Sequence, residues 1–68
     1  MKLYRMITGK DDSEFCHRVT QALNKGWALA GSPSLAFDAE NGQMMCAQAV
    51  TKEVPGSEYV PEMKLGDY

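Results

Sequence analysis

The sequence lacks several features that would assign a function directly. No apolar run approaches the roughly 20 residues of a membrane-spanning helix, and the N-terminus has no apolar core for a secretory signal. We therefore expect a cytoplasmic protein with no membrane partner. The seven basic residues never form a cluster of four, and the net charge is −2. Because nucleic-acid binding depends on neutralising phosphates, the sequence predicts no nucleic-acid partner.

Cysteine and histidine are scarce. Cys16 and Cys46 form neither a disulfide framework nor a zinc site, and both are expected as thiols in a reducing compartment. His17, the only histidine, is adjacent to Cys16, but neighbouring residues on a helix point about 100° apart. We interpret both cysteines as half-buried packing residues and His17 as an exposed residue, and we predict no metal and no cofactor.

Catalytic motifs are also missing. The serines of Gly31-Ser32-Pro33-Ser34 have no base, and the segment is not a nucleophile elbow. The glycines do not have the spacing of a phosphate-binding loop. The acidic group from Asp11 to Glu14 is explained by the start of a helix. The sequence therefore predicts no catalytic residue and favours a protein that is not an enzyme.

The composition is that of a small soluble domain, with 44% apolar and 24% charged residues in a chain of 68. A chain of this length buries only about 60% of its unfolded surface, so such scaffolds usually need a disulfide, a metal or a partner. We expect one domain over residues 1–54. Residues 55–68 form a tail containing Pro and Gly, which is predicted to be partly ordered or packed on a partner.

The first half of the domain reads as a strand followed by a helix. The strand is expected over residues 2–8, and one side of it presents Leu3, Arg5 and Ile7. Asp11 is the expected N-cap of a helix over about residues 12–24. The apolar stripe of that helix consists of Phe15, Val19, Ala22 and Leu23. Gly26 is the expected left-handed residue after the helix.

The second half reads as a bent strand and a hairpin. Residues 27–38 predict one long edge strand that bends at Gly31–Ser34, because proline belongs at an edge or a bulge; two short strands joined by a turn are the alternative. Asn41-Gly42 predicts a hairpin loop. Residues 43–52 have no charge before Lys52, which is typical of a central strand.

These elements predict an α+β fold of β-α-β-β order. The expected sheet has three antiparallel strands in the order 2-3-1, one helix on one face and an extended C-terminal tail; a right-handed parallel pairing of the first two strands is the competing layout. We expect the helix on the side of Ala47 and Ala49, where small residues allow close approach. The other side, with Met44, Cys46 and Val50, then needs cover from the tail or a second subunit, so a homodimer is predicted.

Five residues are candidates for contact with a ligand or partner. Trp27 is interpreted first as a core anchor and second as a contact residue, because tryptophan is enriched at binding hot spots. Tyr4 and Arg5 are placed beside it at a small pocket, and Ser32 and Pro33 lie at the bend.

The pattern of residues resembles the short bacterial family described as domain of unknown function 1737, over about residues 1–54. The residues that carry the resemblance are Lys2-Leu3-Tyr4-Arg5, Thr8-Gly9, Phe15-Cys16-His17-Arg18-Val19, Ala22-Leu23-Asn24, Gly26-Trp27, Gly31-Ser32-Pro33 and Gln48-Ala49-Val50. The resemblance implies a small, stand-alone bacterial cytosolic protein and supplies no activity or catalytic residues.

Two functions follow as hypotheses. The first is a non-enzymatic module that self-associates or binds a protein partner, because the sheet is apolar on both faces and the chain has no catalytic constellation. The alternative is a small-ligand-binding protein or an accessory enzyme subunit with a pocket near Trp27.

Overall fold

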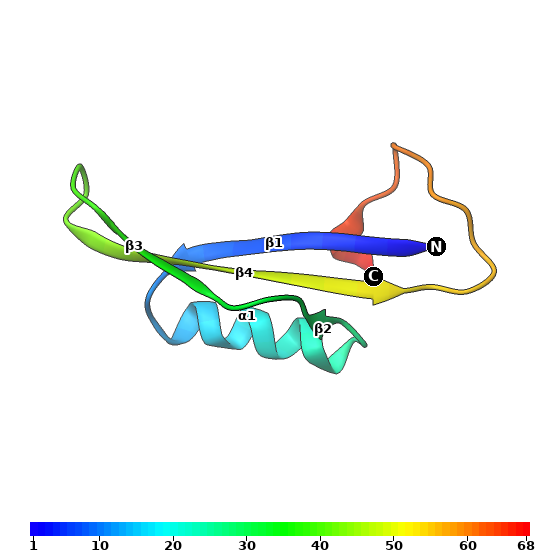
Figure 1. The fold of residues 1–68 in the computed structure, drawn as a ribbon, viewed down its shortest axis with the longest axis horizontal. Helices are drawn as coiled ribbons and strands as arrows, with labels where there is room; N and C mark the ends of the chain where they lie inside the picture. The colour runs from blue at the N-terminus through cyan, green and yellow to red at the C-terminus, as the bar shows by residue number, and fades with distance from the viewer.

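The computed structural model describes all 68 residues as a sheet with one helix packed against it (Figure 1). The elements follow in the order β1 (Lys2–Lys10), α1 (Ser13–Asn24), β2 (Ala28–Leu29), β3 (Ser34–Asp38), β4 (Gln43–Glu53) and the short 3-10 helix η1 (Leu65–Asp67). The α+β class and the expected order of strand, helix, strand and hairpin are confirmed.

β4 is the central strand, as its uncharged sequence predicts. β1 pairs antiparallel along one edge, from Lys2 opposite Glu53 to Lys10 opposite Met45. β2 and β3 pair antiparallel one after the other along the opposite edge. The competing parallel layout is therefore wrong. The sheet has four strands rather than three, because the segment between β2 and β3 leaves the ladder.

The helix begins one residue later than the sequence predicts. Asp12 rather than Asp11 is the N-cap, and its carboxylate accepts the Phe15 N–H at 3.2 Å. The reason lies in the sheet, since the Asp11 N–H donates to the Met44 carbonyl at 3.0 Å and holds Asp11 at the end of the β1–β4 ladder. Neither helix is long and apolar enough to cross a membrane.

The helix ends as expected at Gly26, which has a φ of 97°. The Gly26 N–H donates to Leu23 O, and the Trp27 N–H donates to Ala22 O. This pair of bonds is the Schellman arrangement, which satisfies the last carbonyls of a helix. It turns the chain directly from the helix into the core at Trp27.

The core lies between α1 and one face of the sheet. Residues directly opposite each other in an antiparallel pair share a face, and the register places Leu3 and Ile7 on the face of Gln48 and Val50. The buried apolar residues are Leu3, Ile7, Ala22, Trp27 and Val50. The expectation that the helix covers the alanine side of β4 is therefore wrong. The space between the helix and the sheet is filled by large apolar side chains such as Leu3, Ile7 and Val50. The small side chains of Ala47 and Ala49 would leave that space unfilled.

The C-terminal segment returns to the same face as the helix. Met63, Leu65 and Tyr68 are half-buried against the core, and Lys52 Nζ donates to the Tyr68 carbonyl. Figure 1 shows η1 beside β1, close to the N-terminus. The opposite face of the sheet is therefore uncovered by any part of the chain.

The molecule is elongated. Its radius of gyration is 13.6 Å and its extents are 44 × 23 × 19 Å, whereas a compact domain of this length has a radius of gyration of about 11 Å. The β3–β4 hairpin extends beyond the helix at one end (Figure 1).

Candidate functional site

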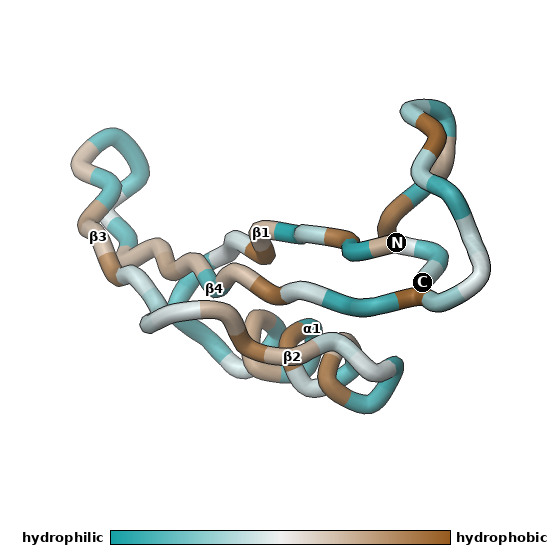
Figure 2. Tube along the Cα trace, turned by 45° about the vertical axis from the view of Figure 1, so that its right-hand side comes forward, coloured by the Kyte–Doolittle hydropathy of each residue, from teal (hydrophilic) through white to brown (hydrophobic).

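Four large apolar residues form an exposed strip on the face where the helix packs. They are Leu29, Leu35, Phe37 and Met44, and we call them the apolar strip. The register places all four on the face of Val50, but α1 packs over β1 and β2 and leaves the hairpin bare. Leu35 and Phe37 are 60% and 63% exposed. Figure 2 shows this hydrophobic stretch of β3 in brown, at the end of the molecule away from the two termini.

A bulge joins the two parts of the strip. Leu29 pairs with Val50 and Ser34 pairs with Ala47, so residues 30–33 stand opposite only Gln48 and Ala49. The bulge contains two extra residues, and an even number preserves the alternation of side chains. Leu35 and Phe37 therefore point to the same face as Leu29.

Gln48 fixes the bulge from the central strand. It is the one buried polar residue, and its Nε2 donates to Gly31 O at 3.3 Å and to Ala49 O at 2.9 Å. Gly31 has a φ of 76°, which a residue with a side chain adopts only with strain. Sequence reasoning missed this role of Gln48. The available signal was a lone amide on the otherwise apolar face of β4.

The outer edge of β3 is unpaired and uncharged over most of its length. Asp38 is the only charged residue from 28 to 38, and its carboxylate turns into the hairpin loop, where Asn41 Nδ2 donates to it at 2.8 Å. That bond holds the pKa of Asp38 below its usual range. The other edge strand, β1, contains Lys2, Arg5 and Lys10. Because lysines on an edge discourage further pairing, β3 is the edge more open to another strand.

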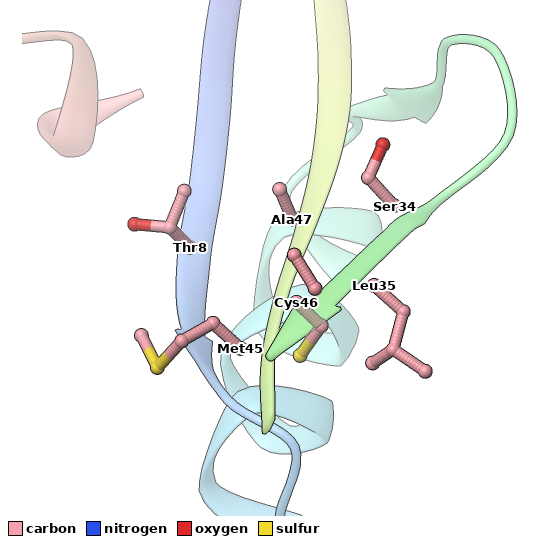
Figure 3. A pocket seen from close by; sticks show the side chains of 7 residues that line it. Thr8, Ser34, Leu35, Met45, Cys46 and Ala47 are labelled. Atoms are coloured by element: carbon pink, nitrogen blue, oxygen red, sulfur yellow. The ribbon is translucent and has the colours of Figure 1, made fainter. Parts of the chain in front are cut away.

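The uncovered face of the sheet contains a shallow apolar hollow of about 170 Å³. Figure 3 shows it in front of the helix, between Thr8 on β1, Met45 and Ala47 on β4, and Ser34 on β3. Its polar side chains are the hydroxyls of Thr8 and Ser34 and the thiol of Cys46. The lining contains no carboxylate, imidazole or amine, and one thiol is the only side chain in it that commonly binds a metal.

The five candidate contact residues lie in three places. Trp27 is 2% exposed and belongs to the core, as its first interpretation predicts. Arg5 lies over its ring, with the guanidinium carbon 5.3 Å from the ring centroid. Tyr4 points to the uncovered face, because neighbouring residues on a strand alternate. Ser32 and Pro33 are exposed in the bulge. The structure thus brings Arg5 to Trp27 and places the other three elsewhere.

The two cysteines are free thiols. Cys16 is exposed rather than half-buried, because it lies beside the apolar stripe of α1 and beyond the edge of its packing. Cys46 is half-buried, with Sγ 3.5 Å from the carbonyls of Gly9 and Lys10. Desolvation, reinforced by the nearby charge of Asp11, raises the pKa of the Cys46 thiol. Cys46 is therefore a weak nucleophile at neutral pH, and no three His, Cys, Asp or Glu side chains gather as a metal site.

Comparison with known proteins identifies a family. The model of the family described as Domain of unknown function (DUF1737) matches residues 1–53, and the chain belongs to this family. The matched segment ends at the last residue of β4, so it includes the apolar strip, the bulge and Gln48. No curated protein and no solved structure matches the chain.

Proposed function

We propose that this member of the DUF1737 family is a non-enzymatic module of the bacterial cytoplasm that self-associates as a homodimer. The contact is the free edge of β3 together with the apolar strip. The observation that carries the proposal is the exposure of Leu35 and Phe37 on an unpaired edge whose one charged residue, Asp38, is bonded within the hairpin loop.

The surface area of the chain supports a partner of substantial size. The chain exposes 4856 Å², whereas a compact monomer of 7.5 kDa exposes about 4,200 Å². The excess of roughly 650 Å² is close to the ~800 Å² that each partner buries in a standard interface. Only six of the 68 residues are buried, so the monomer has a small core and gains stability when this surface is covered.

A second copy of the chain fits this surface better than a charged partner does. Two antiparallel β3 strands pair about a two-fold axis, which is the symmetry of the commonest homo-oligomers. Each copy then contributes the same apolar strip, and apolar surface is complementary to itself. The strip contains no charge for an oppositely charged partner to recognise.

Sedimentation equilibrium at micromolar concentration tests the proposal. The wild-type chain is expected at twice its 7.5 kDa mass, and Leu35→Lys is expected at the monomer mass, because a lysine on the edge opposes strand pairing. Met6→Lys is the matched control, since Met6 is 51% exposed but lies on the uncovered face; it is expected to stay dimeric. A monomeric wild type, or equal loss of mass in both variants, would refute this interface.

A further inference from the structure

A second hollow lies on the other side of the helix, away from the apolar strip. It is bounded by β1, α1 and the C-terminal turn η1, and its volume is about 140 Å³. Its lining is mostly polar and consists of Arg5, Arg18, Gln21, Ala22, Lys25 and Gly66. Arg18, Gln21 and Lys25 are spaced three and four residues apart, so they form one face of α1.

Three basic residues line this hollow, and none of them has a counterion. Arg5, Arg18 and Lys25 are three of the seven basic residues in a chain whose net charge is −2. None of them has a carboxylate within ion-pair distance; the one ion pair of the structure joins the amino terminus to Glu53 at 3.6 Å. Like charges held together repel one another, and a bound anion would relieve that repulsion.

The two guanidinium groups are held in place before any ligand arrives. Arg18 Nη1 donates to the Thr8 carbonyl at 2.7 Å, and Arg5 lies over the ring of Trp27. Each guanidinium has five N–H donors, so most of its donors are free for another acceptor. Binding of an anion therefore costs less conformational entropy, because the two guanidinium groups already have contacts that position them.

We propose that this hollow binds the phosphate group of a small soluble molecule through Arg5, Arg18 and Lys25. Guanidinium forks match the oxygens of a phosphate, and three positive charges suit a dianion better than a single carboxylate. Gln21 adds an amide donor at the rim, and Gly66 borders the hollow without a side chain to fill it. The site is separate from the proposed dimer contact, so either one stands if the other fails.

Nuclear magnetic resonance titration at constant ionic strength tests the site, with inorganic phosphate and glycerol phosphate as probes. Saturable shifts are expected at Arg5, Arg18, Gln21, Lys25 and Gly66. The single variant Lys25→Gln and the double variant Arg18→Gln/Lys25→Gln should weaken binding about fivefold and more than about tenfold. The control, Lys2→Gln/Lys10→Gln, removes the same two charges elsewhere on the surface and should leave binding unchanged.

The single variant keeps the test valid if the loss of Arg18 disturbs folding, because the Lys25 side chain is exposed and forms no ion pair. Non-saturating shifts, or equal weakening in the control pair, would overturn the site. Sedimentation with vesicles containing phosphatidic acid is the second arm. Binding to vesicles that the Lys25→Gln variant abolishes, without binding of glycerol phosphate, would assign the phosphate to a lipid and overturn the soluble ligand.

Discussion

Arg5 lies over the indole ring of Trp27, with its guanidinium carbon 5.3 Å from the ring centroid. The contact joins the middle of β1 to Trp27, which lies three residues beyond the last residue of α1. It also places the single tryptophan beside the cationic hollow that contains Arg5.

Replacing Arg5 with alanine should lower the free energy of unfolding by about 1 kcal/mol, because a cation over an aromatic ring is worth about 0.5–2 kcal/mol. Urea denaturation in the Leu35→Lys background measures this loss without a contribution from association. Lys2→Ala removes a cation that belongs to the same strand but makes no cation–π contact, and it should cost much less. Equal losses would show that the contact with Trp27 does not stabilise the fold.

Leu3→Ala and Leu35→Ala make the same chemical change, the first at a buried position and the second at an exposed one. Leu3 is buried and Leu35 is exposed, so Leu3→Ala should cost about 2–5 kcal/mol and Leu35→Ala less than about 0.5 kcal/mol in the monomer. Thermal unfolding at a concentration below association measures both. A large cost for Leu35→Ala in the monomer would contradict the exposure of the strip.

Gln48→Leu should cost about 1 kcal/mol and loosen the bulge, because it removes the amide that donates to Gly31 O. Hydrogen exchange of residues 30–33 should speed up more than exchange in β1. Gln43→Leu is the control, since its amide contacts only the Met45 sulfur. Unchanged exchange in the bulge would mean that Gln48 does not position it.

Pro33→Ala should disturb association more than folding. Pro33 is exposed in the bulge directly before β3, so its ring stabilises the bend chiefly by restricting the unfolded chain, an effect of about 1 kcal/mol or less. Sedimentation and urea denaturation on the same samples separate the two effects. A proportional loss of both would make the bend purely structural.

Acid should weaken the hairpin loop through Asp38. The Asn41 amide lowers the pKa of Asp38 in the folded state, so the charged carboxylate stabilises the fold above its unfolded pKa of about 4. That stabilisation is lost as the pH falls through the lower folded pKa. Titration of the Asp38 carboxyl by nuclear magnetic resonance should show the lowered pKa, and Asn41→Ala should raise it. An unchanged pKa in this variant would remove the bond as the cause.

Local sequence patterns correctly predicted the elements whose positions depend on neighbouring residues in the chain. Gly26 ended the helix because its left-handed φ completes a Schellman turn, and the uncharged run from Gln43 identified the central strand. The position of the N-cap depended on a long-range bond from Asp11 to Met44, which no local pattern contains. The face chosen by the helix depended on the summed volume of Leu3, Ile7 and Val50.

The candidate sites were less accessible to sequence reasoning for the same reason. Arg5 is on β1, whereas Arg18 and Lys25 are on α1, so their shared hollow exists only after the helix packs. The exposure of Leu35 and Phe37 follows from how far the helix reaches along the sheet. The periodicity of the sequence predicts which face of the sheet a side chain points to. It does not predict whether the helix extends far enough to cover that side chain.

The most direct test of the central claim is an isotope-filtered nuclear Overhauser experiment on a mixture of labelled and unlabelled chains. It detects contacts between two copies of the chain and ignores those within one. The account predicts intermolecular contacts among Leu35, Phe37 and the backbone of β3. Intermolecular contacts confined to Tyr4 and Met6 on the uncovered face, or none at concentrations where sedimentation finds a dimer, would contradict it.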